Sequence, residues 1–345
     1  MAPSVRKPAS FEDRLLAKLR EQVRGRRTGF LLGAGASFLG GAGYPLARSL
    51  WPAIKGKMTA GDRRRIEQGL TRGAENLEQA LDALDRGKGD PVIRHRVTDA
   101  IATAFRSRRP PLDHHRQFVS RLAGRNERRV PVFTPNYDPL LELAADTEQK
   151  HLVDGFSGTV EAYFNPWSFS DYRGSFELRR NRPTFAPLRG IINLYKLHGS
   201  LGWYFDPQEC VRRIRPDMRC PDGWSRLMIP PQNRKAADTG NTPYAFIWSE
   251  FRAHLTNDAS RLLNRLVCSG YGFGDEHVNA IVNPALARRN FTLVVLAKSL
   301  PDRSFKSLLA HDNVLVATET RSSLYGEEGP GMVDAWSFEW LTREV

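Results

Sequence analysis

Cysteine is scarce in this chain, which has only three in 345 residues: Cys210, Cys220 and Cys268. No two of them form a C-x-x-C pair, so the sequence excludes a four-cysteine zinc module and a disulfide framework. Sparse, unpatterned cysteines are typical of a reducing compartment, and we expect the protein to be cytoplasmic.

Long apolar segments are also scarce. The N-terminal segment is charged from Arg6 and Lys7 onward and has no apolar secretory core, so we expect no signal peptide. Residues 28–47 carry no charge over about the length of a membrane span, but six glycines and a proline among them argue against a helix. With 41% hydrophobic and 10% aromatic residues, the composition excludes a disordered chain and predicts a folded protein without a membrane segment.

Acidic residues are few in the first third of the chain. Residues 1–130 contain 27 basic and 13 acidic side chains, which accounts for the whole net charge of +13. A basic field attracts nucleic acid, an acidic partner or an anionic ligand. A solvated, arginine-rich helix surface explains the same composition, and the aromatic residues that would stack on single strands are not interleaved there.

Apolar runs of strand length recur along the chain. Six are bounded by Gly, Pro or Asn, at residues 30–32, 130–133, 191–197, 266–269, 291–297 and 314–317. Most are continuous rather than alternating, which is typical of strands covered on both faces. The pattern predicts an α/β fold with a mostly parallel sheet and helices on both faces.

The chain is long enough for one large domain, and we expect a single catalytic domain over residues 1–345. Helical periodicity between the first two runs predicts a helical insertion or subdomain at residues 55–128. Residues 155–190 and 206–245 have weak periodicity and are rich in Gly, Pro, Asn, Trp and Arg. We expect long loop excursions or a small irregular subdomain there.

The first motif is LLGAGAS at residues 31–37, an apolar strand that runs into a glycine turn. Glycines let the backbone approach a phosphate, and the following amides can point at an anion. Phe38 occupies the third glycine position of the dehydrogenase fingerprint and no acidic residue follows before Asp62, which argues against hydride transfer. There is no P-loop ATPase motif, and a purely structural turn is the alternative.

Polar side chains alternate after the second apolar run, at Thr134, Asn136 and Asp138. The carboxyl ends of strands in an open α/β sheet face the ligand crevice, so these residues are site candidates. The alternative is that Asn136 or Asp138 caps the next helix.

His198 directly follows the third run and precedes a glycine. A histidine in that position can act as a general base near neutral pH, although a structural role is the alternative. The adjacent His114 and His115 have no metal-binding pattern around them, and we interpret them as surface or packing residues.

A second glycine turn follows the fourth run, in CSGYGFGDEHVN at residues 268–279. Gly270 and Gly272 allow another close backbone approach, which suits the other half of a dinucleotide. Asp275 is a candidate cap for the following helix.

The four motifs, in this order, resemble the sirtuin-like superfamily, and in particular bacterial sirtuin-like proteins of anti-phage defence, many of which hydrolyse NAD+. The resemblance covers residues 28–50, 130–143, 191–205 and 264–300 and implies a Rossmann-like fold. It implies an NAD+ phosphate loop at Gly33, Ala34, Gly35 and Ser37, with Thr134, Gly270 and Gly272 also contacting NAD+. It further implies catalytic roles for Asn136 beside the nicotinamide ribose, Asp138 near the nicotinamide amide, and His198.

Two departures from protein-deacylating sirtuins favour hydrolysis. Those enzymes carry four zinc-binding cysteines, and they follow the glycine turn with Asp-Phe-Arg where this chain has Gly43-Tyr44-Pro45. We therefore expect an NAD+ glycohydrolase with NAD+ as substrate and no metal, acting as a triggered defence effector that depletes NAD+. The alternatives are an NAD+-dependent protein deacylase and a non-catalytic NAD-binding subunit of a defence complex.

The resemblance also implies partners. We expect a homo-oligomer, with a DNA-translocating ATPase as a candidate partner. Nucleic acid is a further candidate, through the basic residues 1–130, and a membrane is not expected.

Overall fold

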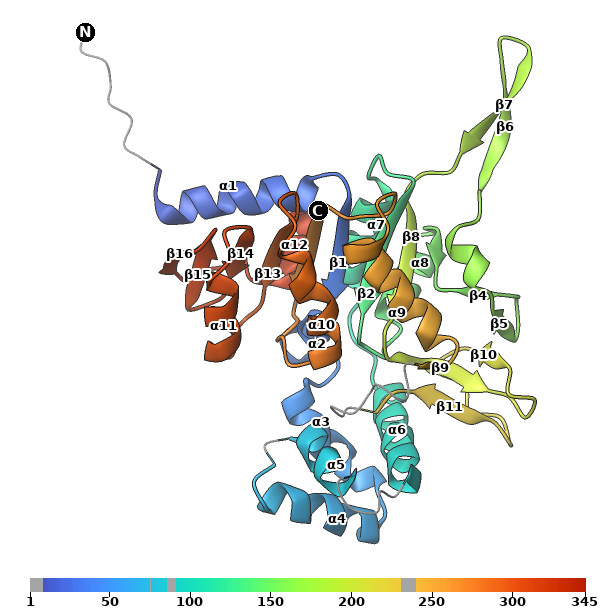
Figure 1. The fold of residues 1–345 in the computed structure, drawn as a ribbon. Coiled ribbons are helices and arrows are strands. Elements are labelled where there is room, and N and C mark those ends of the chain that lie inside the picture. The colour runs from blue at the N-terminus through green and yellow to red at the C-terminus, as the bar shows by residue number, and fades with distance from the viewer. Residues whose placement is uncertain (1–8, 75, 86–90, 231–239) are drawn as a thin grey trace.

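The computed structural model describes residues 9–74, 76–85, 91–230 and 240–345, and a nine-stranded sheet forms its centre (Figure 1). The order across this sheet is β16-β15-β14-β13-β12-β1-β2-β8-β3. Its strands are β1 (Thr28–Leu32), β2 (Arg129–Thr134), β3 (Leu152–Val153), β8 (Ile191–Lys196), β12 (Arg265–Ser269), β13 (Thr292–Leu296), β14 (Val314–Ala317), β15 (Arg321–Leu324) and β16 (Glu327–Pro330). The six predicted strands are confirmed, because each apolar run lies within or overlaps one of them.

Seven neighbouring strands of this sheet, from β14 to β3, are parallel. Counted along the chain, the six long ones have the order 3-2-1-4-5-6 of the Rossmann fold, so the predicted fold class is confirmed. The order reverses between β1 and β12, where Leu31 lies opposite Cys268. Ligands of open α/β sheets bind at this switch point, beyond the carboxyl ends of the strands.

Helices cover both faces of the sheet because β1 is apolar on both. Phe30 and Leu32 pack on one face and Leu31 on the other. The first face is covered by α1 (Phe11–Arg24), α7 (Asp113–Ala123), α8 (Leu140–Thr147) and α12 (Phe338–Glu344). The second is covered by α9 (Tyr244–Arg252), α10 (Glu276–Ala285) and α11 (Asp302–Leu309).

A helical unit beyond the carboxyl edge of the sheet has its own apolar core (Figure 1). It follows the short helix α2 (Ala34–Phe38) and consists of α3 (Ala47–Ile54), α4 (Ala60–Thr71), α5 (Leu77–Asp85) and α6 (Pro91–Arg106). Its core includes Ile54, Ile66 and Val97 and continues into the body through Leu140 and Leu201. The predicted insertion at 55–128 also contains α7, which packs on the main sheet, and residues 75 and 86–90, which lie outside the described residues.

A second, five-stranded antiparallel sheet takes four of its strands from the two segments that we expected to be irregular. Its order is β11-β9-β10-β5-β4, with β4 (Phe156–Ser157), β5 (Ala162–Phe164), β9 (Gly199–Phe205), β10 (Val211–Arg213) and β11 (Ser225–Met228). Four of these strands have only two to four residues, too few to produce a recognisable alternation in the sequence. Residues 231–239 of the expected excursion 206–245 lie outside the described residues.

A hairpin of β6 (Gly174–Arg179) and β7 (Arg182–Pro187) projects away from the body (Figure 1). Arg180 and Asn181 join the strands with φ angles of 51° and 60°, the left-handed conformation of a two-residue type I′ turn. Both strands are exposed along nearly their whole length, and Phe176 and Leu178 are 76% and 78% exposed.

Part of the basic charge of the first third neutralises acidic residues at the other end of the chain. Arg14 pairs with Glu327 at 2.7 Å, and Arg24 pairs with Glu344 at 2.6 Å. These exposed pairs tie α1 to β16 and α12, each with a modest contribution to stability. Within the described residues, no helix has the length and apolar character needed to cross a bilayer.

Candidate functional site

The two glycine turns meet at the switch point of the sheet. The Gly33 amide donates to the Ser269 carbonyl and the Gly35 amide to the Gly270 carbonyl, both at 2.9 Å. Gly270 has a φ of +65°, and a Cβ atom there would lie 2.4 Å from the Ala36 nitrogen. Glycine is therefore required at position 270 for the two turns to meet, whether or not a ligand also approaches the backbone there.

This contact uses amides that the sequence predicts for anion binding. The amides of Gly33 and Gly35 are engaged by the facing turn, and the Ala36 amide donates back to the Gly33 carbonyl at 3.0 Å. Gly272 differs, because a Cβ atom there would have nothing within 4 Å. The second turn thus has open space beside it at Gly272.

Asn136 connects the end of β2 to the first glycine turn. Its Nδ2 atom donates to the Gly33 carbonyl and to Ser37 Oγ, each at 2.9 Å. Its backbone amide donates to Thr134 Oγ1 at 3.0 Å, and that hydroxyl donates to the Leu32 carbonyl at 2.7 Å. Asn136 is thereby held with its amide side chain at the switch point. Thr134 helps to hold Asn136 there, because its hydroxyl accepts from the Asn136 backbone amide.

Asp138 lies buried beside Ser37 and Lys196. Burial raises the pKa of its carboxyl, whereas the Lys196 charge and a hydrogen bond from Ser37 lower it. Asp138 Oδ1 also accepts from the Leu140 amide at 3.2 Å, but the N-cap residue of α8 is Pro139 and the helix has no side-chain cap. The almost fully buried Lys196 ammonium pairs with Glu142 at 2.9 Å and donates to the Asp138 carbonyl. Lys196 was not among the predicted site residues, although a charged residue within a mostly apolar strand is a detectable signal.

The polar groups at this end of β2 surround a cavity of about 10 Å³, which is at the limit for a single water molecule. Its polar lining is Ser37, His115, Thr134, Asn136, Asp138 and Lys196. His115 is buried against Phe338, and burial lowers its pKa to about 3, so it packs as a neutral ring. A nicotinamide ring would enter this cavity only if the surrounding side chains moved.

His198 lies at the end of β8 and pairs with Asp275 from the second glycine turn. Its Nε2 atom is 3.1 Å from Asp275 Oδ2, and the two side chains are only 6% and 10% exposed. The other oxygen of Asp275 accepts from the amides of His277 and Val278 and caps α10. Asp275 therefore has both the predicted capping role and a contact with the candidate base. The sequence did not predict this pairing, because Asp275 and His198 are far apart along the chain.

Backbone contacts join the asparagine and histidine parts of the site. The Leu197 amide donates to the Thr134 carbonyl at 2.8 Å, and the Leu201 amide donates to the Tyr137 carbonyl at 3.0 Å. The predicted residues of all four motifs thus gather at one edge of the sheet. Gly33, Ser37, Thr134, Asn136 and Asp138 form one connected group. His198 and Asp275 form a second, adjacent group.

Cys268, in the strand that leads to the second glycine turn, offers no reactive thiol at this edge. Cys268 is fully buried in β12, and burial raises the pKa of its thiol. In the parts of the chain that the structure describes, no group of three or more His, Cys, Asp or Glu side chains could hold a metal ion.

The fold and the position of these residues define a Rossmann-like α/β protein with its candidate site at the topological switch point. The chain belongs to the SIR2-like domain family, whose family model matches residues 130–316, and so to the sirtuin-like superfamily. Among solved structures, the chain is similar to a mutant Sir2 homologue in complex with ADP-ribose, at 12% identity, 95% coverage of both chains and a TM-score of 0.43. No curated protein sequence matches it significantly.

Proposed function

We propose that this protein is an NAD+ glycohydrolase, which cleaves the bond between nicotinamide and ribose to give nicotinamide and ADP-ribose. Membership of the SIR2-like family supports NAD+ as the substrate. The observation that carries the proposal is the arrangement of Asn136, fixed by Gly33 and Ser37 at the switch point, next to the buried His198–Asp275 pair.

The chemistry needs a polarising amide, a base and a fixed ribose. In the reaction, the bond between ribose C1′ and the nicotinamide nitrogen breaks, and its electron pair neutralises the positively charged ring. Water adds to the oxocarbenium-like C1′ and loses a proton. Asn136 orients the ribose hydroxyls or the water, His198 accepts the proton, and Asp275 holds the imidazole in place.

Asp138 has one of two roles in this proposal. As a carboxylate it stabilises the cationic transition state, and in its protonated form it donates a hydrogen bond to the nicotinamide amide. Burial raises the pKa of the Asp138 carboxyl, and the Lys196 charge opposes part of that rise.

The small cavity supports an enzyme that is active only after a conformational change. The space of about 10 Å³ beside Asp138 is too small for nicotinamide, so a nicotinamide ring that contacts Asp138 from this side would need the lining side chains to move. We propose that assembly or a partner produces this movement, in keeping with a triggered anti-phage effector that depletes NAD+. A homo-oligomer, a DNA-translocating ATPase and nucleic acid bound through residues 1–130 are the candidate triggers.

The test is release of nicotinamide from NAD+ by the purified protein, alone and with each candidate trigger. Asn136→Ala and His198→Ala should each lower turnover about 100-fold or more, as expected for loss of a positioned catalytic group. The surface variants Asn290→Ala and His151→Ala, which remove the same side-chain types elsewhere, should keep wild-type turnover. Full activity in both site variants, or no turnover in any assembly state, would refute the proposal. Consumption of NAD+ only with an acylated peptide would indicate a deacylase instead.

A further inference from the structure

A separate polar pocket of about 370 Å³ lies at the opposite edge of the sheet, at the amino ends of β1, β2 and β12. Arg27 precedes β1, Arg128 precedes β2 and Leu263 precedes β12, and all three line the pocket. The candidate site lies at the carboxyl ends of the same strands, so the two sites are distinct. The volume is within the range of roughly 300–1,000 Å³ of small-molecule sites.

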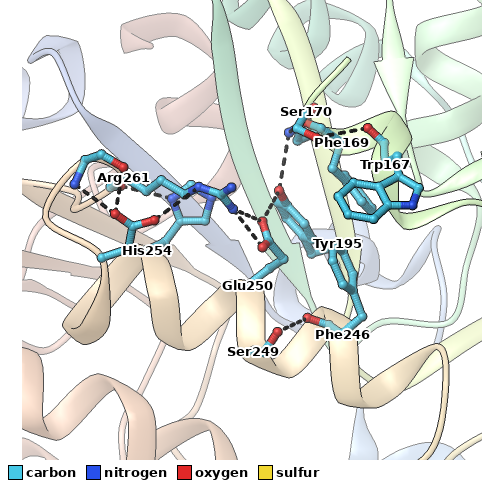
Figure 2. Close-up of polar contacts among 12 residues, drawn as sticks. Trp167, Phe169, Ser170, Tyr195, Phe246, Ser249, Glu250, His254 and Arg261 are labelled. Carbon is cyan, nitrogen blue, oxygen red and sulfur yellow. Dashed lines mark hydrogen bonds and ion pairs between the residues drawn. The ribbon is translucent and has the colours of Figure 1, made fainter.

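One wall of the pocket is a connected hydrogen-bond network (Figure 2). Arg261 donates to both oxygens of Glu250, at 2.8 and 2.9 Å, and the Tyr195 hydroxyl donates to Glu250 at 3.3 Å. His254 Nδ1 is 3.1 Å from the Arg261 carbonyl and belongs to η5 (Ala253–Asn257), a π-helical turn. Such turns occur frequently at functional sites. The charge of Glu250 is therefore already neutralised from within the wall.

A second part of the wall carries Arg27, Arg128 and Arg129, none of which forms an ion pair among the described residues, although the Asp171 charge acts on Arg129. Arg128 stacks on Tyr172, with its guanidinium carbon 3.5 Å from the ring centroid. Arg129 donates to Asn193 Oδ1 at 2.7 Å, which is a neutral acceptor. Glu127, the second acid that lines the pocket, already pairs with Arg125 at 3.1 Å.

The arginines of this wall also repel one another. Burial lowers the pKa of the Arg129 guanidinium, and the charges of Arg128 and Arg173 add to this effect, whereas Tyr195 and Asp171 oppose it. The Nε atoms of Arg128 and Arg129 are buried and have no hydrogen-bond partner among the described residues. An anion between these side chains would relieve the repulsion and accept charge-assisted hydrogen bonds.

We propose that this pocket binds a small phosphorylated ligand of mononucleotide size, with its phosphate on Arg27, Arg128 and Arg129. A bare phosphate would fill only part of the space. The remaining wall, which includes Phe169, Pro131 and Leu263, offers apolar contact to a sugar or base. The proposal does not depend on the reaction proposed above, because binding at this edge is measured directly.

The test is isothermal titration of the full chain with AMP, ribose 5-phosphate and inorganic phosphate. We expect AMP to bind at least tenfold more tightly than inorganic phosphate. Arg128→Gln and Arg27→Gln should each weaken AMP binding at least tenfold. Arg180→Gln, the same charge change at the tip of the hairpin, should bind AMP as the wild type does. Circular dichroism checks that each variant folds. If Arg128→Gln fails to fold, Arg27→Gln still tests the proposal, because Arg27 is exposed and its substitution should not disturb the fold.

Three results would overturn the proposal. Wild-type affinity in both pocket variants would place the ligand elsewhere, including the carboxyl edge. Equal weakening in Arg180→Gln would indicate non-specific attraction by the net positive charge. The absence of binding at millimolar ligand, or equal affinity for AMP and inorganic phosphate, would contradict the assigned ligand class.

Discussion

Replacing Gly270 with alanine should destabilise the protein by breaking the contact between the two glycine turns. The added Cβ atom would lie 2.4 Å from the Ala36 nitrogen and 2.6 Å from the Gly35 carbonyl carbon. Both are backbone atoms, so no side chain can rotate away to make room. The Gly33 and Gly35 hydrogen bonds to the second turn would lengthen as the turns separate.

The expected loss has two parts. A φ of +65° costs an L-residue roughly 1–2 kcal/mol relative to glycine. The backbone collision adds a cost comparable to overpacking a core, about 1–3 kcal/mol. We therefore expect the free energy of unfolding to fall by about 2–5 kcal/mol. For a chain of 345 residues this lowers Tm by about 3–7 °C.

Gly272→Ala is the matched control in the same turn. Its Cβ atom would meet nothing within 4 Å and its φ is not in the left-handed region. Alanine there should change the free energy of unfolding by less than about 1 kcal/mol, in either direction. Thermal unfolding by circular dichroism measures both variants without reference to any activity. Equal Tm values for the two variants would refute the reasoning that Gly270 is required by contact between the turns.

Three further predictions concern buried ionisable groups. Asp275→Asn keeps a good helix cap, so we expect the free energy of unfolding to change by less than about 0.5 kcal/mol. The substitution removes the charge beside His198, so kcat for NAD+ hydrolysis should fall about 10- to 100-fold. An unchanged kcat would contradict the positioning role of Asp275. Lys196→Met leaves the partly buried Glu142 without its partner and should cost about 2–4 kcal/mol at pH 7. Because burial raises the pKa of Glu142, urea unfolding should show this loss shrinking as the pH falls and the carboxyl takes up a proton. The pKa of His115 is about 3 in the folded protein against an ordinary value of 6.5, so the unfolded chain takes up a proton at a higher pH than the folded protein does. The free energy of unfolding should therefore fall by about 2 kcal/mol from pH 6.5 to pH 5. The fall should be much smaller in His115→Gln.

The parallel sheet could be predicted because its strands are buried on both faces. The run at residues 191–197 is apolar throughout apart from Asn193 and Lys196, and all six residues of β8 are buried. The hairpin β6–β7 could not be predicted in this way, because it has no buried face. Residues 175–179 do alternate polar and apolar side chains, but the apolar Phe176 and Leu178 are exposed instead of facing a core.

Site residues were predictable where a polar side chain directly follows a strand. Asn136 and His198 stand just beyond β2 and β8, and the parallel arrangement brings both to one edge. The pairing of His198 with Asp275 was not predictable, because it depends on how the second turn folds over β8. The same limit applies to the arginine pocket, whose residues precede strands and look like solvated loop charges in the sequence.

The two outer edges of the β6–β7 hairpin differ in their ability to pair with a further strand. Leu178 lies opposite Pro183, and Gly174 lies opposite Pro187. Proline has no amide hydrogen, so the outer edge of β7 lacks donors at two positions and resists pairing with another strand. β6 contains no proline, and its free edge can accept a strand. Any extension of this ribbon by another chain would therefore add to β6 and leave β7 as the permanent edge.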